Sequence, residues 1–86
     1  MQERLITAEQ IRAARSVLGW TTAQLSEKTG VGTATLKRYE ATAGVPKSRK
    51  DSLQRIQSVF EAAGIEFIGS PDDAPGIRIH SANRRH

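Results

Sequence analysis

The segment WTTAQLSEKTGVGTATLKRYE, residues 20–40, predicts two short helices joined by a tight turn. Thr21 can cap the start of the first helix, and Gln24 three positions later completes a capping box. Gly30 can adopt the left-handed backbone conformation that ends a helix. The next two residues form the turn, and a second helix is expected over residues 33–40. Two helices joined by a short turn that contains glycine are typical of a DNA-binding helix-turn-helix.

The segment resembles the helix-turn-helix of the Cro/repressor-type family, also called the XRE family or lambda-repressor-like domains. The residues that match the family pattern are Trp20, Thr21, Gln24, Leu25, Gly30, Val31, Gly32, Leu36, Tyr39 and Glu40. Gly32 departs from the pattern because the family prefers serine at this helix start. Glycine costs only about a few tenths of a kcal/mol relative to serine there. The resemblance covers roughly residues 6–63 and implies a compact DNA-binding domain.

Size and charge also favour a small binding domain. The chain has 86 residues, enough for one domain with a small core. Its 13 Lys and Arg against 9 Asp and Glu give a net charge of +4, which favours an anionic partner, with nucleic acid as the first choice. Because the chain has no cysteine, it cannot form a disulfide, a cysteine-based zinc site or a thiol nucleophile.

The sequence offers no sign of a membrane segment. No apolar run approaches the 18 or so residues that a membrane-spanning helix needs. The first ten residues, MQERLITAEQ, are charged and lack the apolar core of a signal peptide. A cytoplasmic location is therefore expected.

Two further helices are expected to flank the central pair. Thr7 and Gln10 form a second capping box ahead of a helix over residues 8–18. A fourth helix is expected to begin at residue 49 or 50 and to run to residue 63. The fold class is thus mainly α, a four-helix lambda-repressor-like domain. Its predicted core consists of Ile11, Leu18, Leu25, Val31, Leu36, Leu53, Ile56 and Phe60.

Two residues near the central pair are expected to have structural roles. Trp20 is expected to pack between the first two helices. The family resemblance implies an ion pair between Arg15 and Glu40, which would fix the angle of the second helix of the pair. A bidentate arginine–carboxylate pair is geometrically specific. Because this role is structural, neither partner is counted among the binding residues.

The last quarter of the chain changes character. Residues 65–68 and 77–80 are β-prone runs separated by the Pro- and Gly-rich segment 69–76, which predicts a hairpin with an eight-residue loop. An isolated two-stranded hairpin is marginally stable, so we expect it to pack on the fourth helix or to pair with another chain. The expected organisation is a helix-turn-helix domain over 1–64, a hairpin over 65–80 that is a candidate dimerisation element, and a disordered tail over 81–86.

The predicted binding residues follow from how such helices meet DNA. A recognition helix enters the major groove with its N-terminal residues toward the base edges, and free N–H groups at another helix start can hold a phosphate. Basic residues in the following loop would contact flanking phosphates. The predicted DNA contacts are Thr22, Gln24, Thr33, Ala34, Thr35, Lys37, Arg38, Lys47, Ser48, Arg49 and Lys50. The alternative interpretation is that the charged members form a solvated helix face and an ordinary solvated loop.

The sequence contains no combination of residues typical of a catalytic or metal site. His80 and His86 lack a carboxylate at metal-ligand spacing, and Asp72 and Asp73 lie where turn-forming residues are expected. We therefore expect no enzymatic activity, no cofactor and no bound metal.

These observations favour a sequence-specific DNA-binding transcriptional regulator, a repressor that binds a palindromic operator on double-stranded DNA as a homodimer. One alternative with the same fold is an antitoxin-like autoregulator that also binds a toxin protein. Another is a protein-interaction adaptor whose helix-turn-helix no longer binds DNA. Both alternatives require a protein partner, so co-purification of such a partner would favour them.

Overall fold

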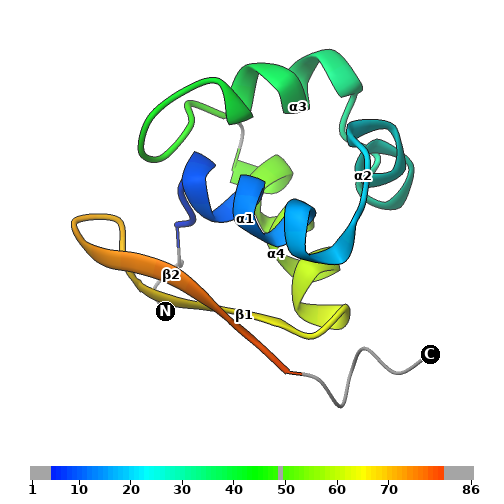
Figure 1. The fold of residues 1–86 in the computed structure, drawn as a ribbon. Coiled ribbons are helices and arrows are strands. Elements are labelled where there is room, and N and C mark those ends of the chain that lie inside the picture. The colour runs from blue at the N-terminus through cyan, green and yellow to red at the C-terminus, as the bar shows by residue number, and fades with distance from the viewer. Residues whose placement is uncertain (1–4, 49, 81–86) are drawn as a thin grey trace.

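The computed structural model describes residues 5–48 and 50–80, which form four helices followed by an antiparallel two-stranded hairpin (Figure 1). The predicted combination of four helices with a C-terminal hairpin is confirmed. The elements are α1 (Ala8–Leu18), α2 (Thr22–Thr29), α3 (Thr33–Glu40), α4 (Lys50–Ala62), β1 (Ile65–Ser70) and β2 (Asp73–Ile79). Helix α4 ends one residue earlier than expected. None of the helices in the described ranges is long and apolar enough to cross a membrane.

The first two helices begin at the predicted capping boxes. The Oγ1 atom of Thr7 accepts a hydrogen bond from the backbone N–H of Gln10 at 3.1 Å, and the Gln10 side chain accepts one from the Thr7 backbone N–H at 2.9 Å. Thr21 and Gln24 exchange the same two bonds at 3.0 and 2.8 Å. Gly30 ends α2 with a φ of 78°, in the left-handed region where glycine carries no Cβ penalty. Local sequence thus sets these helix boundaries.

The core extends further along the chain than the sequence predicted. It contains all the expected core residues except Leu18, which is only partly buried because it lies at the last turn of α1. The complete cluster is Ile6, Ile11, Ala14, Leu25, Val31, Leu36, Tyr39, Leu53, Ile56, Phe60, Ile65 and Phe67. Trp20 stacks on Phe60 of α4, with ring centroids 5.6 Å apart. The expected position of Trp20 between the first two helices omitted this partner.

The predicted eight-residue loop of the hairpin is wrong. Both strands continue into the Pro- and Gly-rich segment, and Ser70 pairs with Asp73 across a two-residue turn. The register shifts between Ile68 and Ser70, so the strand bulges there. Gly69, with a φ of 76°, supplies the positive-φ conformation that such a bulge uses. Proline after Ser70 suits the first central position of a tight turn, so residues that indicated a loop instead form a short turn and a bulge.

The hairpin packs on the helices of its own chain. Strand β1 lies along α4 and β2 lies along α1, on the side of α1 opposite α3 (Figure 1). The ring of Phe67 is buried and makes an edge contact with Phe60 at 6.1 Å between centroids. From α1, the Gln10 Nε2 atom donates to the backbone oxygens of Ile68 and Gly76 at 3.2 and 2.8 Å. The hairpin therefore contributes to the same core as the helices and leaves α3 uncovered.

Candidate nucleic-acid interface

Helix α3 has one buried face and one exposed face. Leu36 and Tyr39 point into the core and are 0% and 3% exposed. The residues on the opposite side, Thr33, Ala34, Lys37 and Arg38, are all exposed. This spacing places two small side chains at the first turn of the helix and two cations at the second. Gly32 begins the helix without a side-chain hydrogen bond, so the first backbone N–H groups of α3 lack the capping bond that α1 and α2 have.

The C-terminal end of α3 is attached to α1 by the predicted ion pair. The Nε and Nη2 atoms of Arg15 donate to the two carboxylate oxygens of Glu40, each at 2.9 Å, and Nη1 donates to the backbone oxygen of Trp20 at 3.0 Å. The hydrogen bonds to Glu40 raise the pKa of Arg15, against the opposing effect of burial. Arg12 also donates to the backbone oxygen of Glu40. These contacts confirm the Arg15–Glu40 pair and hold α3 at one angle to α1.

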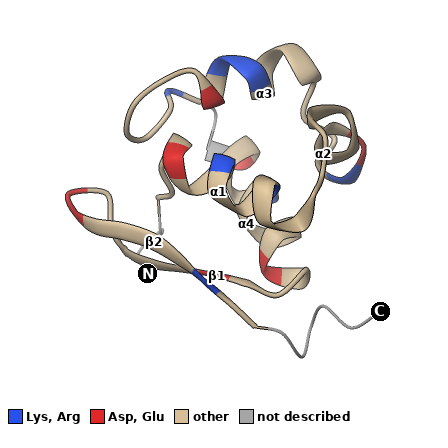
Figure 2. Ribbon diagram, viewed as in Figure 1, with Lys and Arg blue, Asp and Glu red and all other residues tan. Residues whose placement is uncertain are grey.

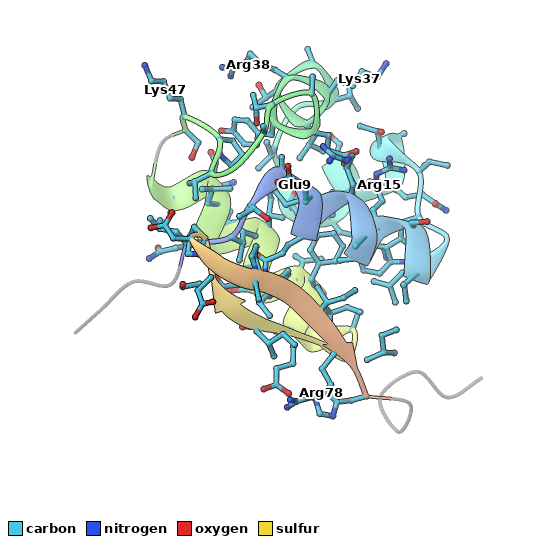
Figure 3. The ribbon with its side chains drawn as sticks, turned by 60° about the vertical axis from the view of Figure 1, so that its left-hand side comes forward. Glu9, Arg15, Lys37, Arg38, Lys47 and Arg78 are labelled. Atoms are coloured by element: carbon cyan, nitrogen blue, oxygen red, sulfur yellow. The ribbon has the colours of Figure 1, made fainter. Side chains whose placement is uncertain are left out.

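Basic side chains gather at the α3 end of the molecule. Figure 2 shows Lys and Arg on the second half of α3, next to the acidic residue at its C-terminal end. In Figure 3, Lys37, Arg38 and Lys47 project outward at this end, whereas Arg78 projects from the hairpin at the other end. Glu40 is already neutralised by Arg15. Within the described ranges, no carboxylate forms an ion pair with Lys37, Arg38 or Lys47, so their positive charge is available to an external anion.

A groove of about 510 Å³ opens beside α3. It brings together four of the predicted contact residues, Thr35, Arg38, Lys47 and Ser48. They come from α3 and from the loop that follows it. The remaining lining residues are Gly30, Val31 and Gly32 of the turn, Tyr39 of α3, and Ser52 and Arg55 of α4. We call this surface the turn–α4 groove.

Other predicted contact residues lie outside the turn–α4 groove. Thr33, Ala34 and Lys37 are on the exposed part of α3, and Thr22 is half-buried at the start of α2. Gln24 is exposed, but its Oε1 atom accepts the capping hydrogen bond from Thr21. Only the Gln24 amide nitrogen thus stays available to donate to an anion. Arg49 and the side chain of Lys50 lie outside what the structure describes, as do residues 81–86, so these predictions stay predictions.

The sequence interpretation missed Ser52 and Arg55. Both lie on α4, where the predicted core face drew attention to the apolar residues. Ser52 and Arg55 are three positions apart, which places them on one face of α4. Arg55 forms an exposed ion pair with Asp51, four positions earlier on the same helix. Only the packing of α4 beside the turn shows that Arg55 reaches the groove.

The arrangement provides hydrogen-bond donors and positive charge, which are suited to binding an anion. Within the described residues, no three His, Asp or Glu side chains are grouped so that they could hold a metal ion. No family model matches the chain, and no curated protein matches it either.

Proposed function

We propose that the chain is a sequence-specific DNA-binding transcriptional regulator of the Cro/repressor type and that α2, the turn and α3 act as its helix-turn-helix. The observation that supports this most is the division of α3 into a buried face, held by Leu36 and Tyr39, and an exposed face that carries Lys37 and Arg38. A helix supported in this way can enter a groove without losing its packing.

The exposed face of α3 suits the major groove of B-DNA, which is about 12 Å wide and admits one helix. Thr33 and Ala34, at the leading turn, are short enough for the backbone to come close to base edges. Their methyl groups can contact a thymine methyl, and the threonine hydroxyl can hydrogen-bond a base. Arg38 can reach a guanine or a phosphate, and Lys47 can reach a flanking phosphate. The Arg15–Glu40 pair keeps this face directed outward.

A two-fold arrangement would let two copies of α3 read the half-sites of a palindromic operator about one helical turn apart. We assign dimer formation to the hairpin, whose two strands each leave one edge without a neighbouring strand within the described chain. Light scattering on the full chain and on a chain ending at Gly64 tests this. Because the hairpin also fills the core, the shortened chain must first be shown to keep its helical circular dichroism. Equal masses for the two folded chains would exclude the hairpin as the dimer element.

The DNA-binding proposal is tested by selecting DNA sites from a random duplex library and measuring their affinity by fluorescence anisotropy at several salt concentrations. Wild-type protein should prefer the selected sequence and should bind more weakly as salt increases. Arg38→Ala should weaken binding by about tenfold or more. Lys28→Ala removes one positive charge from the last turn of α2, outside the predicted DNA contacts and the hairpin, and should have a much smaller effect. Failure to enrich any sequence, or equal affinities for the two variants, would overturn the proposal.

A further inference from the structure

We infer that the turn–α4 groove is the seat of one backbone phosphate of the bound DNA and that Arg55 of α4 is a ligand of that phosphate. The inference rests on the proposed function, because it names a contact made while α3 occupies the major groove. It adds a residue that neither the sequence pattern nor the exposed face of α3 indicates.

The charge of the groove supports an anionic ligand. Three cationic side chains line it, those of Arg38, Lys47 and Arg55, and none of the described residues that line it is acidic. The hydroxyl groups of Ser48 and Ser52 lie in the same lining. Guanidinium groups and hydroxyls are common ligands of phosphate oxygens in protein–DNA contacts. The groove is therefore built from phosphate ligands contributed by three separate parts of the chain.

Arg55 is held in position while keeping donors available. Its Nη1 atom donates to the backbone oxygen of Thr29 at 3.3 Å, and its Nη2 atom donates to Asp51 at 2.9 Å. A Cβ atom at Gly30 would lie only 3.1 Å from Nη1, so the absence of a side chain there lets the guanidinium approach the turn. A guanidinium has five N–H donors. The two observed bonds orient the group and leave other donors to face the groove.

The ion pair with Asp51 does not prevent phosphate binding. The side chains of Arg55 and Asp51 are 50% and 69% exposed, and an ion pair this exposed to solvent is weak. A phosphate can bind the arginine from the groove side, and Asp51 then acts mainly as a nearby repulsive charge. Removing the Asp51 carboxylate should therefore strengthen DNA binding, whereas removing the Arg55 guanidinium should weaken it.

The position of the groove matches the path of a DNA strand beside the recognition helix. Thr35 and Arg38 belong both to α3 and to the groove lining, so a duplex that holds α3 in its major groove has a strand backbone next to this surface. Contacts to phosphates fix the register of a protein on the duplex. Through Arg55, α4 would set how far α3 enters the groove.

The test measures binding of the full chain to the selected operator as a function of salt. Arg55→Gln should weaken binding about tenfold and reduce the steepness of the log–log salt dependence by about 0.9 per site, the contribution of one phosphate. Lys28→Gln removes one positive charge from the last turn of α2, outside the turn–α4 groove and the hairpin, and should have little effect on either quantity. Asp51→Asn should strengthen binding about threefold, and Glu61→Gln, the matched change near the end of α4, should do so less.

Neutral methylphosphonate links placed singly along the operator identify the phosphate. One link per half-site should weaken the wild-type complex by a larger factor than it weakens the Arg55→Gln complex, because Arg38 and Lys47 still line the groove in that variant. Arg55→Lys keeps the charge and should give an affinity between those of wild-type and Arg55→Gln. If Arg55→Gln unfolds at a much lower temperature than wild-type, Arg55→Lys is used in its place. If wild-type and Arg38→Ala behave as proposed but every Arg55 variant binds like wild-type, the phosphate seat is overturned and the DNA-binding function stands. If wild-type protein prefers no sequence, the proposed function itself fails.

Discussion

Replacing Gln10 with alanine tests whether one side chain joins the helical part of the molecule to the hairpin. The Gln10 Oε1 atom caps α1, and its Nε2 atom donates to two backbone oxygens of the hairpin, those of Ile68 and Gly76. Gln24 caps α2 in the same way but is exposed, and none of the described residues of the hairpin bonds to it. The two glutamines thus form a matched pair within one chain.

The expected loss of stability in each glutamine variant is the sum of the interactions that the variant removes. Loss of the capping interaction costs about 1 kcal/mol in either variant. Each hydrogen bond to the hairpin contributes about 1 kcal/mol net, so Gln10→Ala should reduce the free energy of unfolding by about 3 kcal/mol in total. For a domain of this size, 1 kcal/mol shifts the midpoint of thermal unfolding by about 4–8 °C. We therefore expect a fall of about 12–24 °C for Gln10→Ala and about 4–8 °C for Gln24→Ala.

Thermal unfolding followed by circular dichroism, without DNA, measures both values. Urea unfolding of the same variants gives the free energies directly and shows whether the transition stays two-state. A larger loss for Gln10→Ala would support the clamp between α1 and the hairpin. If both variants lose the same stability, the two hydrogen bonds to the hairpin contribute nothing and the reasoning is refuted.

Four further substitutions test single positions of the fold. Glu40→Gln removes the counter-charge of the Arg15 guanidinium, and should lower the free energy of unfolding in urea by about 2 kcal/mol and weaken DNA binding. Unchanged values of both would contradict the role of this ion pair in anchoring α3. Gly69→Ala should destabilise the hairpin by about 2 kcal/mol, because Gly69 has a φ of 76° and the new Cβ would lie 2.3 Å from the backbone oxygen of Ala74. Gly32→Ser adds a capping side chain at the start of α3, where the new atoms meet open space, and should raise the melting midpoint by about 2 °C. The hydrogen bond from His80 lowers the pKa of Glu66, so its stabilising contribution is present above the ordinary glutamate pKa and is lost as pH falls through the lowered value. Melting curves from pH 7 to pH 3 should accordingly show a smaller acid-side fall for Glu66→Gln than for wild-type.

Helix positions could be predicted from the sequence because the interactions that set them are local. A threonine and a glutamine three residues apart can hydrogen-bond to each other's backbone without any tertiary contact, and glycine adopts a positive φ without a tertiary neighbour. The buried and exposed faces of α3 follow from helical periodicity in the same way. The conformations of the loop before α4 and of the hairpin turn could not be predicted in detail, because Pro- and Gly-rich segments are compatible with loops, turns and bulges alike.

The second role of Gln10 and the position of Arg55 could not be predicted in this way. Gln10 bonds to a backbone oxygen 66 positions away, and Arg55 bonds to one 26 positions away. Such contacts depend on how α4 and the hairpin pack, which no local pattern specifies.

Local sequence sets where the helices begin and which face of α3 is polar, because hydrogen bonds between near neighbours fix the former and helical periodicity fixes the latter. Tertiary packing places Arg38, Lys47 and Arg55 along one groove and puts the hairpin on the side of α1 opposite α3, because the burial of an apolar core brings distant segments together.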